Sequence, residues 1–405
     1  MSEWIRMKLS ECCSSIADGD HQPPPKAETG IPFVTISNMT STNQFDFSDT
    51  LFVPQEYYDK LDEKRKARKD DILYSVVGSF GIPVFMKEDK AFVFQRHIAI
   101  LRPDNEKIVP RFLFYTMLTK DFYAKADAAA IGAAQRTVSL TALRNMEICI
   151  PDKIQQSKIV DTLAAYDDLI ENNQKQIKLL EETAQRLYKE WFVDLRFPGH
   201  ENTEIVDGLP EGWRNGRADE FFEITIGKTP PRAEKQWFVK GDEGVAWASI
   251  SDMGNAGAFL FNTAEGLTED AVANHNMKVV PIGTILLSFK LTLGRVSITT
   301  KPMCTNEAIA HFRINNPEDR EYTYSYLKNF EYDTLGNTSS ISKAVNSKII
   351  KAMPFIMPDE FIKVEYSKRV APIMDDIYTK QKQIISLAEA RDRLLPKLMS
   401  GEIEL

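Results

Sequence analysis

Apolar residues recur at alternating steps of four and three along one long stretch of the chain. The positions are Ile159, Leu163, Tyr166, Ile170, Asn173, Ile177, Leu180, Ala184, Leu187 and Trp191, with Asn173 as the one polar interruption. This heptad pattern predicts a long helix whose narrow apolar seam packs against another helix.

A second stretch, 207 residues further on, repeats the pattern. Its seam positions are Tyr366, Val370, Ile373, Ile377, Lys380, Ile384, Leu387, Arg391, Leu394 and Leu398. Both stretches begin with Pro-Asp and contain Gln-Lys-Gln-Ile, at 174–177 and 381–384. The partner of the first helix is therefore expected in the same chain.

The repeat extends into the segments before each helix, where the offset drifts between about 207 and 214. Alternating or apolar runs predict paired strands at Ile31–Met39 and Val245–Met253, Ile72–Ser75 and Ile285–Ser288, and Phe94–Ile100 and Thr305–His311. Helices are predicted at Pro110–Tyr123 and Tyr322–Tyr332, and short strands at Met146–Ile150 and Met353–Met357. The chain thus reads as a tandem duplication in the α+β class, with two pseudo-symmetric α/β domains and an antiparallel two-helix coiled coil.

The repeat predicts the domain boundaries. They are a first globular domain at 1–150, a long helix at 151–197, a joint at 198–208, a second globular domain at 209–357 and a second long helix at 358–405. The joint is too short to span a helix of this length, so the helices are expected to pair antiparallel. Asn173 and Lys380 would then meet near the middle of the pair; alternatively, Lys380 extends to solvent.

Composition and charge restrict the function only weakly. The 405 residues are 43% hydrophobic and 27% charged, with a net charge of −8 that is concentrated on the two heptad stretches. No apolar run is long enough to cross a bilayer and the first residues lack a signal-peptide core, so we expect a cytoplasmic protein. Cys12, Cys13, Cys149 and Cys304 form no metal-binding or disulfide pattern.

No catalytic signature is present in the sequence. It contains no phosphate-binding loop, no His-Glu-x-x-His motif and no dinucleotide fingerprint, and its five histidines are scattered. Two domains on a helical spacer suit a target with two half-sites, such as duplex DNA. The alternative is a two-headed scaffold that binds proteins rather than DNA.

Four segments resemble a known family, the specificity subunits of type I restriction–modification systems. They are Gln185–Leu195 (QRLYKEWFVDL), Arg393–Gly401 (RLLPKLMSG), Cys304–Ile309 (CTNEAI) and Asp71–Ser75 (DILYS). The order of domain, helix, domain and helix adds to the likeness, which covers essentially the whole chain.

The resemblance implies a non-catalytic subunit whose two target recognition domains read a split DNA sequence. It implies two modification subunits, which bind S-adenosylmethionine and methylate adenine, and restriction subunits, which use ATP and Mg. No cofactor is expected on this chain itself. Glu307 stands where many relatives are expected to carry Gln; it could read a cytosine amino group or be a surface acid.

Polar residues of the predicted loops are the candidate DNA contacts, and each group has a plain structural alternative. A dense basic run would contact phosphates, or is a solvated loop neutralised by nearby acids: Lys64, Arg65, Lys66, Arg68 and Lys69. Residues after the Ser75 and Ser288 strands would approach bases, or form ordinary hairpins: Ser79, Lys290, Thr292 and Arg295. The pairs Gln95 and Arg96, and Asn306 and Glu307, suit base reading, or are polar edge-strand residues.

Further candidates lie in the polar loops before the last strands and beside proline-rich turns. The former are Gln135, Arg136, Ser339, Ser340 and Lys343, and the latter are Lys228, Thr229 and Arg232, with His21 and Gln22 in the first half. Trp191, Phe192, Leu398 and Met399 end the two seams. They would contact a methylating partner, or simply close the seam.

Overall fold

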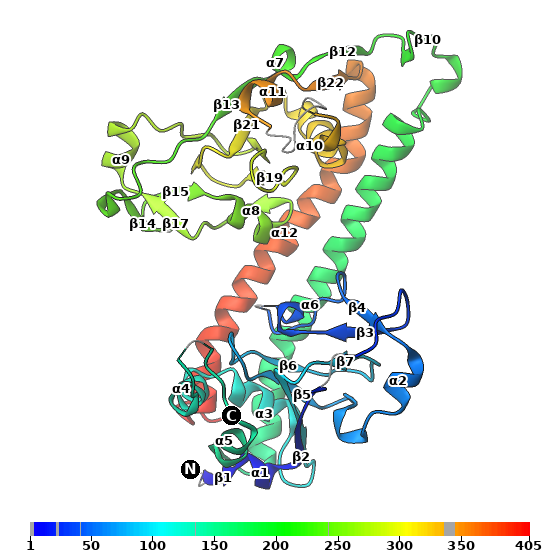
Figure 1. The fold of residues 1–405 in the computed structure, drawn as a ribbon. Helices are drawn as coiled ribbons and strands as arrows, with labels where there is room; N and C mark the ends of the chain where they lie inside the picture. Colours follow the sequence, from blue (N-terminus) through cyan, green and yellow to red (C-terminus); the bar gives the residue numbers. More distant parts are fainter. Residues whose placement is uncertain (1–3, 22–23, 41, 134, 242, 336–344) are drawn as a thin grey trace. The chain divides into compact units, whose positions relative to one another are not determined.

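The computed structural model describes all residues except 1–3, 22–23, 41, 134, 242 and 336–344 (Figure 1). The chain forms two compact units. The first unit holds Met1–Leu169 and Leu387–Leu405, and the second holds Ile170–Ser386. Each unit therefore contains parts of both long helices, whereas the predicted domain boundaries, which stay a prediction, treat those helices as separate spacers.

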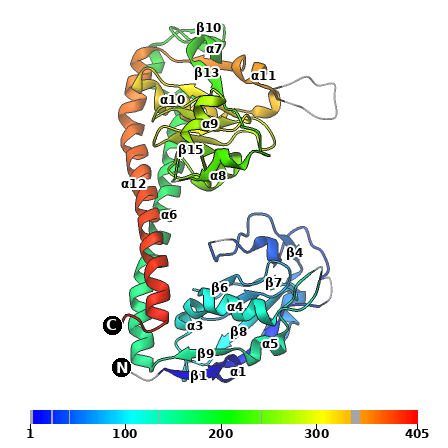
Figure 2. The ribbon, with the colours of Figure 1, turned by 90° about the vertical axis from the view of Figure 1, so that its left-hand side faces the viewer.

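The two long helices form as predicted and pair antiparallel. Helix α6 covers Lys153–Tyr188 and continues as a π-helical turn at Lys189–Val193, and α12 covers Glu360–Met399. Both ribbon views show α12 beside α6 (Figures 1 and 2). In the first unit, the Arg391 guanidinium lies 2.8 Å from the Asp167 carboxylate, so the end of α12 meets the start of α6. All twenty predicted seam positions are buried or half-buried.

The predicted meeting of Asn173 with Lys380 is wrong in detail. The Asn173 amide donates a hydrogen bond of 3.2 Å to Gln383, one turn further along α12. The Lys380 ammonium instead lies 3.4 Å from the Asp376 carboxylate on its own helix. The long lysine side chain can leave the seam for this neighbouring charge, whereas the short Asn173 side chain needs a polar partner across it.

The first unit is built on three antiparallel or mixed sheets. Their strand orders are β1-β9, β2-β8-β5-β6 and β4-β3-β7. The strands are β1 Ile5–Lys8, β2 Cys13–Asp18, β3 Ile31–Val34, β4 Leu51–Val53, β5 Ile72–Ser75, β6 Pro83–Phe85, β7 Val93–Phe94, β8 Ile98–Pro103 and β9 Glu147–Ile150.

The second unit repeats this topology with one strand added to each of the two larger sheets, β16 in one and β14 in the other. Its sheets are β12-β22, β13-β21-β18-β19-β16 and β14-β17-β15-β20, and a short pair, β10-β11, lies in the joint. The strands are β10 Ile205–Val206, β11 Leu209–Pro210, β12 Arg214–Arg217, β13 Glu223–Ile226, β14 Phe238–Lys240, β15 Val245–Ala248, β16 Phe259–Leu260, β17 Glu265–Leu267, β18 Ile285–Ser288, β19 Val296–Thr299, β20 Cys304–Thr305, β21 Ile309–Arg313 and β22 Pro354–Met357. The predicted tandem duplication and α+β class are confirmed.

Short helices connect these strands. They are α1 Leu9–Cys12, α2 Gln55–Asp59, α3 Pro110–Met117, α4 Lys120–Ala129, α5 Leu140–Asn145, α7 Ala218–Phe221, α8 Ile250–Ala256, α9 Glu269–Asn274, α10 Arg320–Asn329 and α11 Ser347–Lys351. The single helix predicted at Pro110–Tyr123 is wrong. It is two helices, because the Thr119 hydroxyl accepts a hydrogen bond from the Phe122 amide and starts α4 anew.

Two of the predicted strands are shorter than the alternating pattern suggested. The first ends at Val34, where Thr35 begins a 3₁₀ turn whose Asn38 side chain accepts the Thr35 amide at 2.9 Å. The second ends at Ala248, where Ser249 and Asp252 form a capping box at the start of α8. In both halves a capping side chain overrides the alternation at the same place in the repeat.

The four side chains predicted to contact a partner are largely used inside the chain. Trp191 is 5% exposed and its ring lies 5.8 Å from that of Tyr366, while Phe192 packs on Tyr322. Leu398 is fully buried in the core of the first unit, with Met399 packed against that core. The alternative of seam closure therefore describes what these residues do in this chain.

Other expectations concern membranes, metals and thiols. None of the described helices combines the length and apolarity needed to cross a bilayer. Among the residues outside the undescribed stretches, no three His, Cys, Asp or Glu side chains gather as metal ligands would. All four cysteines are free thiols, and Cys12, Cys13 and Cys304 are buried.

Candidate nucleic-acid interface

One exposed turn occurs at the same place in both units. The predicted strands Phe94–Ile100 and Thr305–His311 are each interrupted, because the chain passes there from one sheet to another. The Ile98 amide donates to the Gln95 carbonyl at 3.0 Å, and the Ile309 amide donates to the Asn306 carbonyl at 3.3 Å. Gln95 and Arg96 are thus structurally equivalent to Asn306 and Glu307, and they lie in turns rather than on an edge strand.

A glycine brings a second loop against each of these turns. A Cβ atom on Gly19 would lie 2.2 Å from the Phe94 carbonyl oxygen, and one on Gly227 would lie 2.1 Å from that of Asn306. Only glycine allows such an approach. This pair of glycines was not among the predicted residues, although both glycines end the matching first segments of the two halves.

The third component is a hairpin held by a serine. The Ser75 hydroxyl donates to the Ser79 carbonyl at 3.0 Å, and the Ser288 hydroxyl donates to the Thr292 carbonyl at 2.6 Å. The hairpin also bonds to the turn, since the Phe289 amide donates to the Ala308 carbonyl at 2.9 Å. Turn, glycine loop and hairpin therefore form one cluster in each unit.

In the second unit this cluster gathers most of the predicted residues. The Thr229 hydroxyl donates to the Glu307 carboxylate. This hydrogen bond, with the charges of Lys290 and Arg232, lowers the pKa of Glu307. Glu307 is therefore ionised at neutral pH and can only accept hydrogen bonds, as reading a cytosine amino group requires.

Arg232 and Arg295 are more strongly engaged within the chain. The Arg232 guanidinium lies 2.9 Å from Glu265 and 4.5 Å from the centre of the Trp247 ring. Arg295 donates to the Ile250 carbonyl at 2.6 Å, which ties the hairpin to α8. Arg295 thus positions the hairpin, whereas Lys228, Lys290 and Glu307 are exposed.

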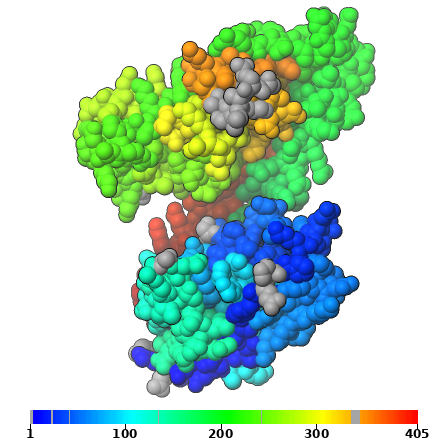
Figure 3. Space-filling model, in the orientation of Figure 1, coloured from blue at the N-terminus to red at the C-terminus, as the bar shows by residue number. Residues whose placement is uncertain are grey.

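In the first unit the equivalent loops border a pocket of about 320 Å³. It is lined by Asp18, Val76, Val77, Arg96, His97, Gln135, Thr137, Val138, Ser139 and Leu140. Two predicted residues, Arg96 and Gln135, thus face the same pocket. In the space-filling view, dark blue, blue and cyan atoms share this unit's surface, so distant stretches of sequence meet there (Figure 3).

The remaining loop candidates either pair with acids of the first unit or lie outside the described residues. Arg136 pairs with Asp127 and its guanidinium lies 5.5 Å from the centre of the Phe80 ring. His21 lies 2.6 Å from Asp18. Ser339, Ser340 and Lys343 lie outside the described residues, as does Gln22.

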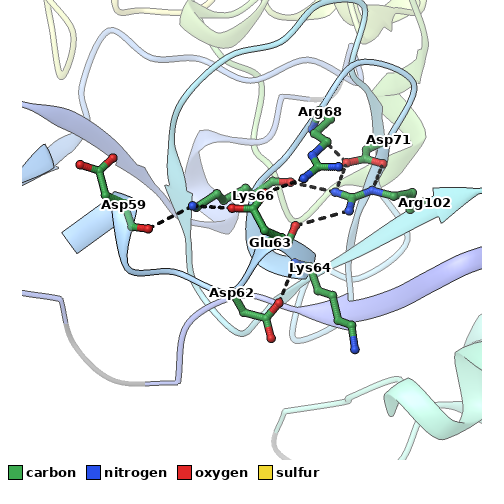
Figure 4. A network of polar contacts seen from close by, with 8 residues as sticks. All are labelled: Asp59, Asp62, Glu63, Lys64, Lys66, Arg68, Asp71 and Arg102. Carbon is green, nitrogen blue, oxygen red and sulfur yellow. Dashed lines mark hydrogen bonds and ion pairs between the residues drawn. The ribbon is translucent and has the colours of Figure 1, made fainter. Parts of the chain in front are cut away.

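The basic run of the first unit is mostly neutralised by its neighbours (Figure 4). Lys66 and Arg68 both pair with Glu63, at 2.7 and 2.5 Å. Arg65 lies 3.8 Å from Asp18, which borders the pocket. Lys64 is exposed and its ammonium points away from the acids in Figure 4, and Lys69 is also exposed. Of the run, these two lysines are best placed for phosphates.

One buried histidine, His311, lies next to the cluster of the second unit and bonds two of its neighbouring strands. His311 is 1% exposed, and its ring nitrogens lie 2.9 and 2.7 Å from the hydroxyls of Thr225 and Thr305. Burial lowers the pKa of His311 from its ordinary value of 6.5 to about 4. The imidazole is therefore neutral in the folded unit.

Because the pKa of His311 is lowered, we expect the stability of the second unit to decrease in acid. Below pH 6.5, His311 binds a proton in the unfolded chain but stays neutral in the folded chain. The free energy of unfolding therefore decreases as the pH falls from 6.5 towards 4. We expect the native chain to lose about 3 kcal/mol more than His311→Gln over this window. Chemical denaturation of both full chains at a series of pH values measures the difference. Parallel stability curves would contradict the prediction.

The comparisons with known proteins agree with this architecture. A family model for the type I restriction modification DNA specificity domain matches residues 1–182 and 210–389. The HindI type I restriction enzyme specificity subunit of Haemophilus influenzae is 25% identical over 479 aligned residues, which cover 100% of both chains. The MjaIX specificity subunit of Methanocaldococcus jannaschii is 26% identical, over 74% of this chain and 70% of its own length.

A solved structure shares the fold. The crystal structure of the type I restriction-modification system S subunit from M. genitalium aligns with a TM-score of 0.59 and 18% identity. The alignment covers 98% of this chain and 96% of the other. The two family matches together span most of the chain and coincide with its two repeats. The chain therefore belongs to the type I restriction–modification DNA specificity family, whose members are non-catalytic subunits that determine which DNA sequence the complex recognises.

Proposed function

We propose that this subunit recognises a bipartite DNA sequence, with one half-site read by each unit, and directs methyltransferase and restriction subunits to it. The observation that carries the proposal is the repeated loop cluster. The same turn, glycine loop and serine-held hairpin recur in both units, but the side chains on them differ. A repeated scaffold with different exposed side chains suits two readers of two different half-sites.

The exposed groups have the chemistry that base edges and phosphates require. Gln95 and Asn306 can bond adenine, Arg96 can bond guanine, and ionised Glu307 can accept from cytosine. Lys64, Lys69, Lys228 and Lys290 supply charge for phosphates despite the net charge of −8. The scaffold alternative, in which the chain binds proteins, does not require side chains of this chemistry at the same place in both units.

The chain acts in this proposal through separate catalytic subunits. Two modification subunits would bind S-adenosylmethionine and methylate adenine, and restriction subunits would use ATP and Mg. Because these subunits would act on chromosomal DNA, we expect the complex in the cytoplasm. Since Trp191, Phe192 and Leu398 are packed inside the chain, other exposed surfaces would hold these partners.

Replacing one unit's globular part tests the proposal. We expect exchange of residues 209–357 for the matching segment of another specificity subunit to change one half-site and leave the other half-site intact. Mapping methylated bases in a host that carries the hybrid measures both halves at once. The reciprocal exchange of residues 1–150 is the matched control. If a hybrid complex methylates the native sequence unchanged, the assignment of readers is wrong.

A further inference from the structure

A single leucine stands fully exposed at the tip of the second unit's hairpin. Leu291 is 102% exposed, so its side chain packs on nothing within the chain. Lys290 and Thr292 flank it, and both are exposed polar residues. A fully solvated leucine contributes nothing to a core, which leaves its apolar surface free for a ligand.

The backbone at this leucine is strained. Its φ angle is +61°, where non-glycine residues are rare, and the equivalent position in the first unit is Gly78, with φ +68°. The Thr292 amide donates to the Lys290 carbonyl at 2.7 Å, which closes a tight γ-turn centred on Leu291. The second repeat thus carries a leucine where glycine would fit without strain.

The tip is nevertheless held firmly. The Ser288 hydroxyl bonds the Thr292 carbonyl at 2.6 Å, and the Gly294 amide donates to the Ser288 carbonyl at 3.0 Å. Arg295 ties the hairpin to the Ile250 carbonyl. A rigid hairpin presents its side chain with little loss of conformational freedom on binding.

The surroundings of the tip indicate what it meets. The hairpin bonds the turn that carries Asn306 and Glu307, and Lys290 is close enough to influence the Glu307 carboxylate. This inference rests on the proposed function. If the cluster reads DNA, Leu291 lies among side chains that face base edges. In the major groove the thymine 5-methyl group is the apolar feature of those edges.

We propose that Leu291 reads a thymine in the half-site of the second unit through contact with its 5-methyl group. The strained turn aims the leucine at the base, and Lys290 beside it supplies charge for the adjoining phosphate. The first unit, with Gly78 at the same place, lacks this contact and reads its half-site without it.

Replacing thymine by deoxyuridine tests this contact, because the change removes one methyl group and no hydrogen-bonding group. The full chain, assembled with the modification subunit of its own system, is bound to duplexes of the recognised sequence determined by methylation mapping. Each thymine of the second half-site is replaced in turn. We expect one replacement to weaken binding about fourfold, the effect of losing one buried methyl contact.

Variants of the leucine complete the test. In Leu291→Gly, which relieves the strain and should not lower the melting temperature, the same replacement should have no effect. Leu291→Met should keep the thymine dependence. Ile282→Ala removes another exposed apolar side chain, 65% exposed and before β18 rather than after it, and should keep the dependence too.

Two results would overturn the assignment of Leu291: no thymine in that half-site responds to replacement, or the response persists in Leu291→Gly. Either result leaves the proposed function standing if the complex still prefers its recognised sequence over a scrambled duplex. Failure of that preference in the native complex would instead refute the proposed function.

Discussion

Lengthening both long helices by one heptad should widen the unspecified gap of the recognised DNA while leaving both half-sites unchanged. The insertions belong after Glu171 in α6 and after Ser386 in α12, close to the facing pair Asn173 and Gln383. Seven residues preserve the apolar seam and add about 10 Å to each helix, or up to about three base pairs. Methylation mapping in a host carrying the variant reads the new gap directly.

The duplex rotates by about a third of a turn over three base pairs, whereas a heptad nearly preserves the helix faces. The lengthened complex should therefore bind its new site more weakly than the native complex binds its own. An insertion in α6 alone is the control, since it places the two seams out of register and should abolish methylation. An unchanged gap in the doubly lengthened variant would show that these helices do not set the spacing.

Replacing Arg102 by methionine should strongly destabilise the first unit. The Arg102 guanidinium donates two hydrogen bonds, of 3.0 and 2.9 Å, to the carboxylate of Asp71, whose side chain is 2% exposed (Figure 4). Without Arg102 this buried carboxylate would lack its counter-charge. We expect a loss of about 3–5 kcal/mol in the free energy of unfolding, measured by chemical denaturation of the full chain.

The repeat supplies a matched control for this change. Arg313 occupies the place of Arg102 on the equivalent strand, β21, but its pair with Glu223 is exposed, at 55% and 58% for the two side chains. Arg313→Met should therefore change stability by less than about 1 kcal/mol. Equal losses in the two variants would mean that burial of Asp71 does not decide the effect.

The parts of the fold that the sequence predicted well are those with a strong periodic signal. The heptad seams and the runs ILYS and ILLS formed the expected helices and strands because burial along their length outweighs local alternatives. The repeat itself was the most reliable guide. It predicted that Gln95 corresponds to Asn306 and Ser75 to Ser288, and the hydrogen bonds of the two turns and hairpins agree.

What the sequence could not give was the effect of single side chains on the local backbone. Thr35 and Ser249 each start a helical turn within a segment that was predicted as a strand, and Thr119 divides a segment that was predicted as one helix. The partner of Asn173 was likewise missed. The heptad pattern identifies the seam positions of each helix, but it does not show whether Asn173 meets Lys380 or Gln383, three residues further on. These choices depend on geometry across the fold rather than on periodicity.

The candidate site shows the same division. Residue type and position in the repeat were enough to predict Asn306 and Glu307 as candidate contacts. The basic run around Lys66 is less free to bind phosphates than its sequence suggests, because the Lys66 ammonium pairs with the Glu63 carboxylate and donates to the Asp59 carbonyl. Leu291 and Gly227 were not nominated at all. A leucine in a loop and a glycine after a strand acquire meaning through a φ angle or a close approach, which the sequence does not display.

The division of the chain into its two units has a consequence for how the protein is made. Residues 387–405 belong to the first unit, where Leu395 and Leu398 pack with Ile159 and Leu163. The first unit therefore cannot close its core until residues 387–405 have been synthesised. Until then, the seam of α6 in that unit stays open to solvent and to chaperones. Removal of residues 387–405 should accordingly damage the part of the protein that was synthesised first.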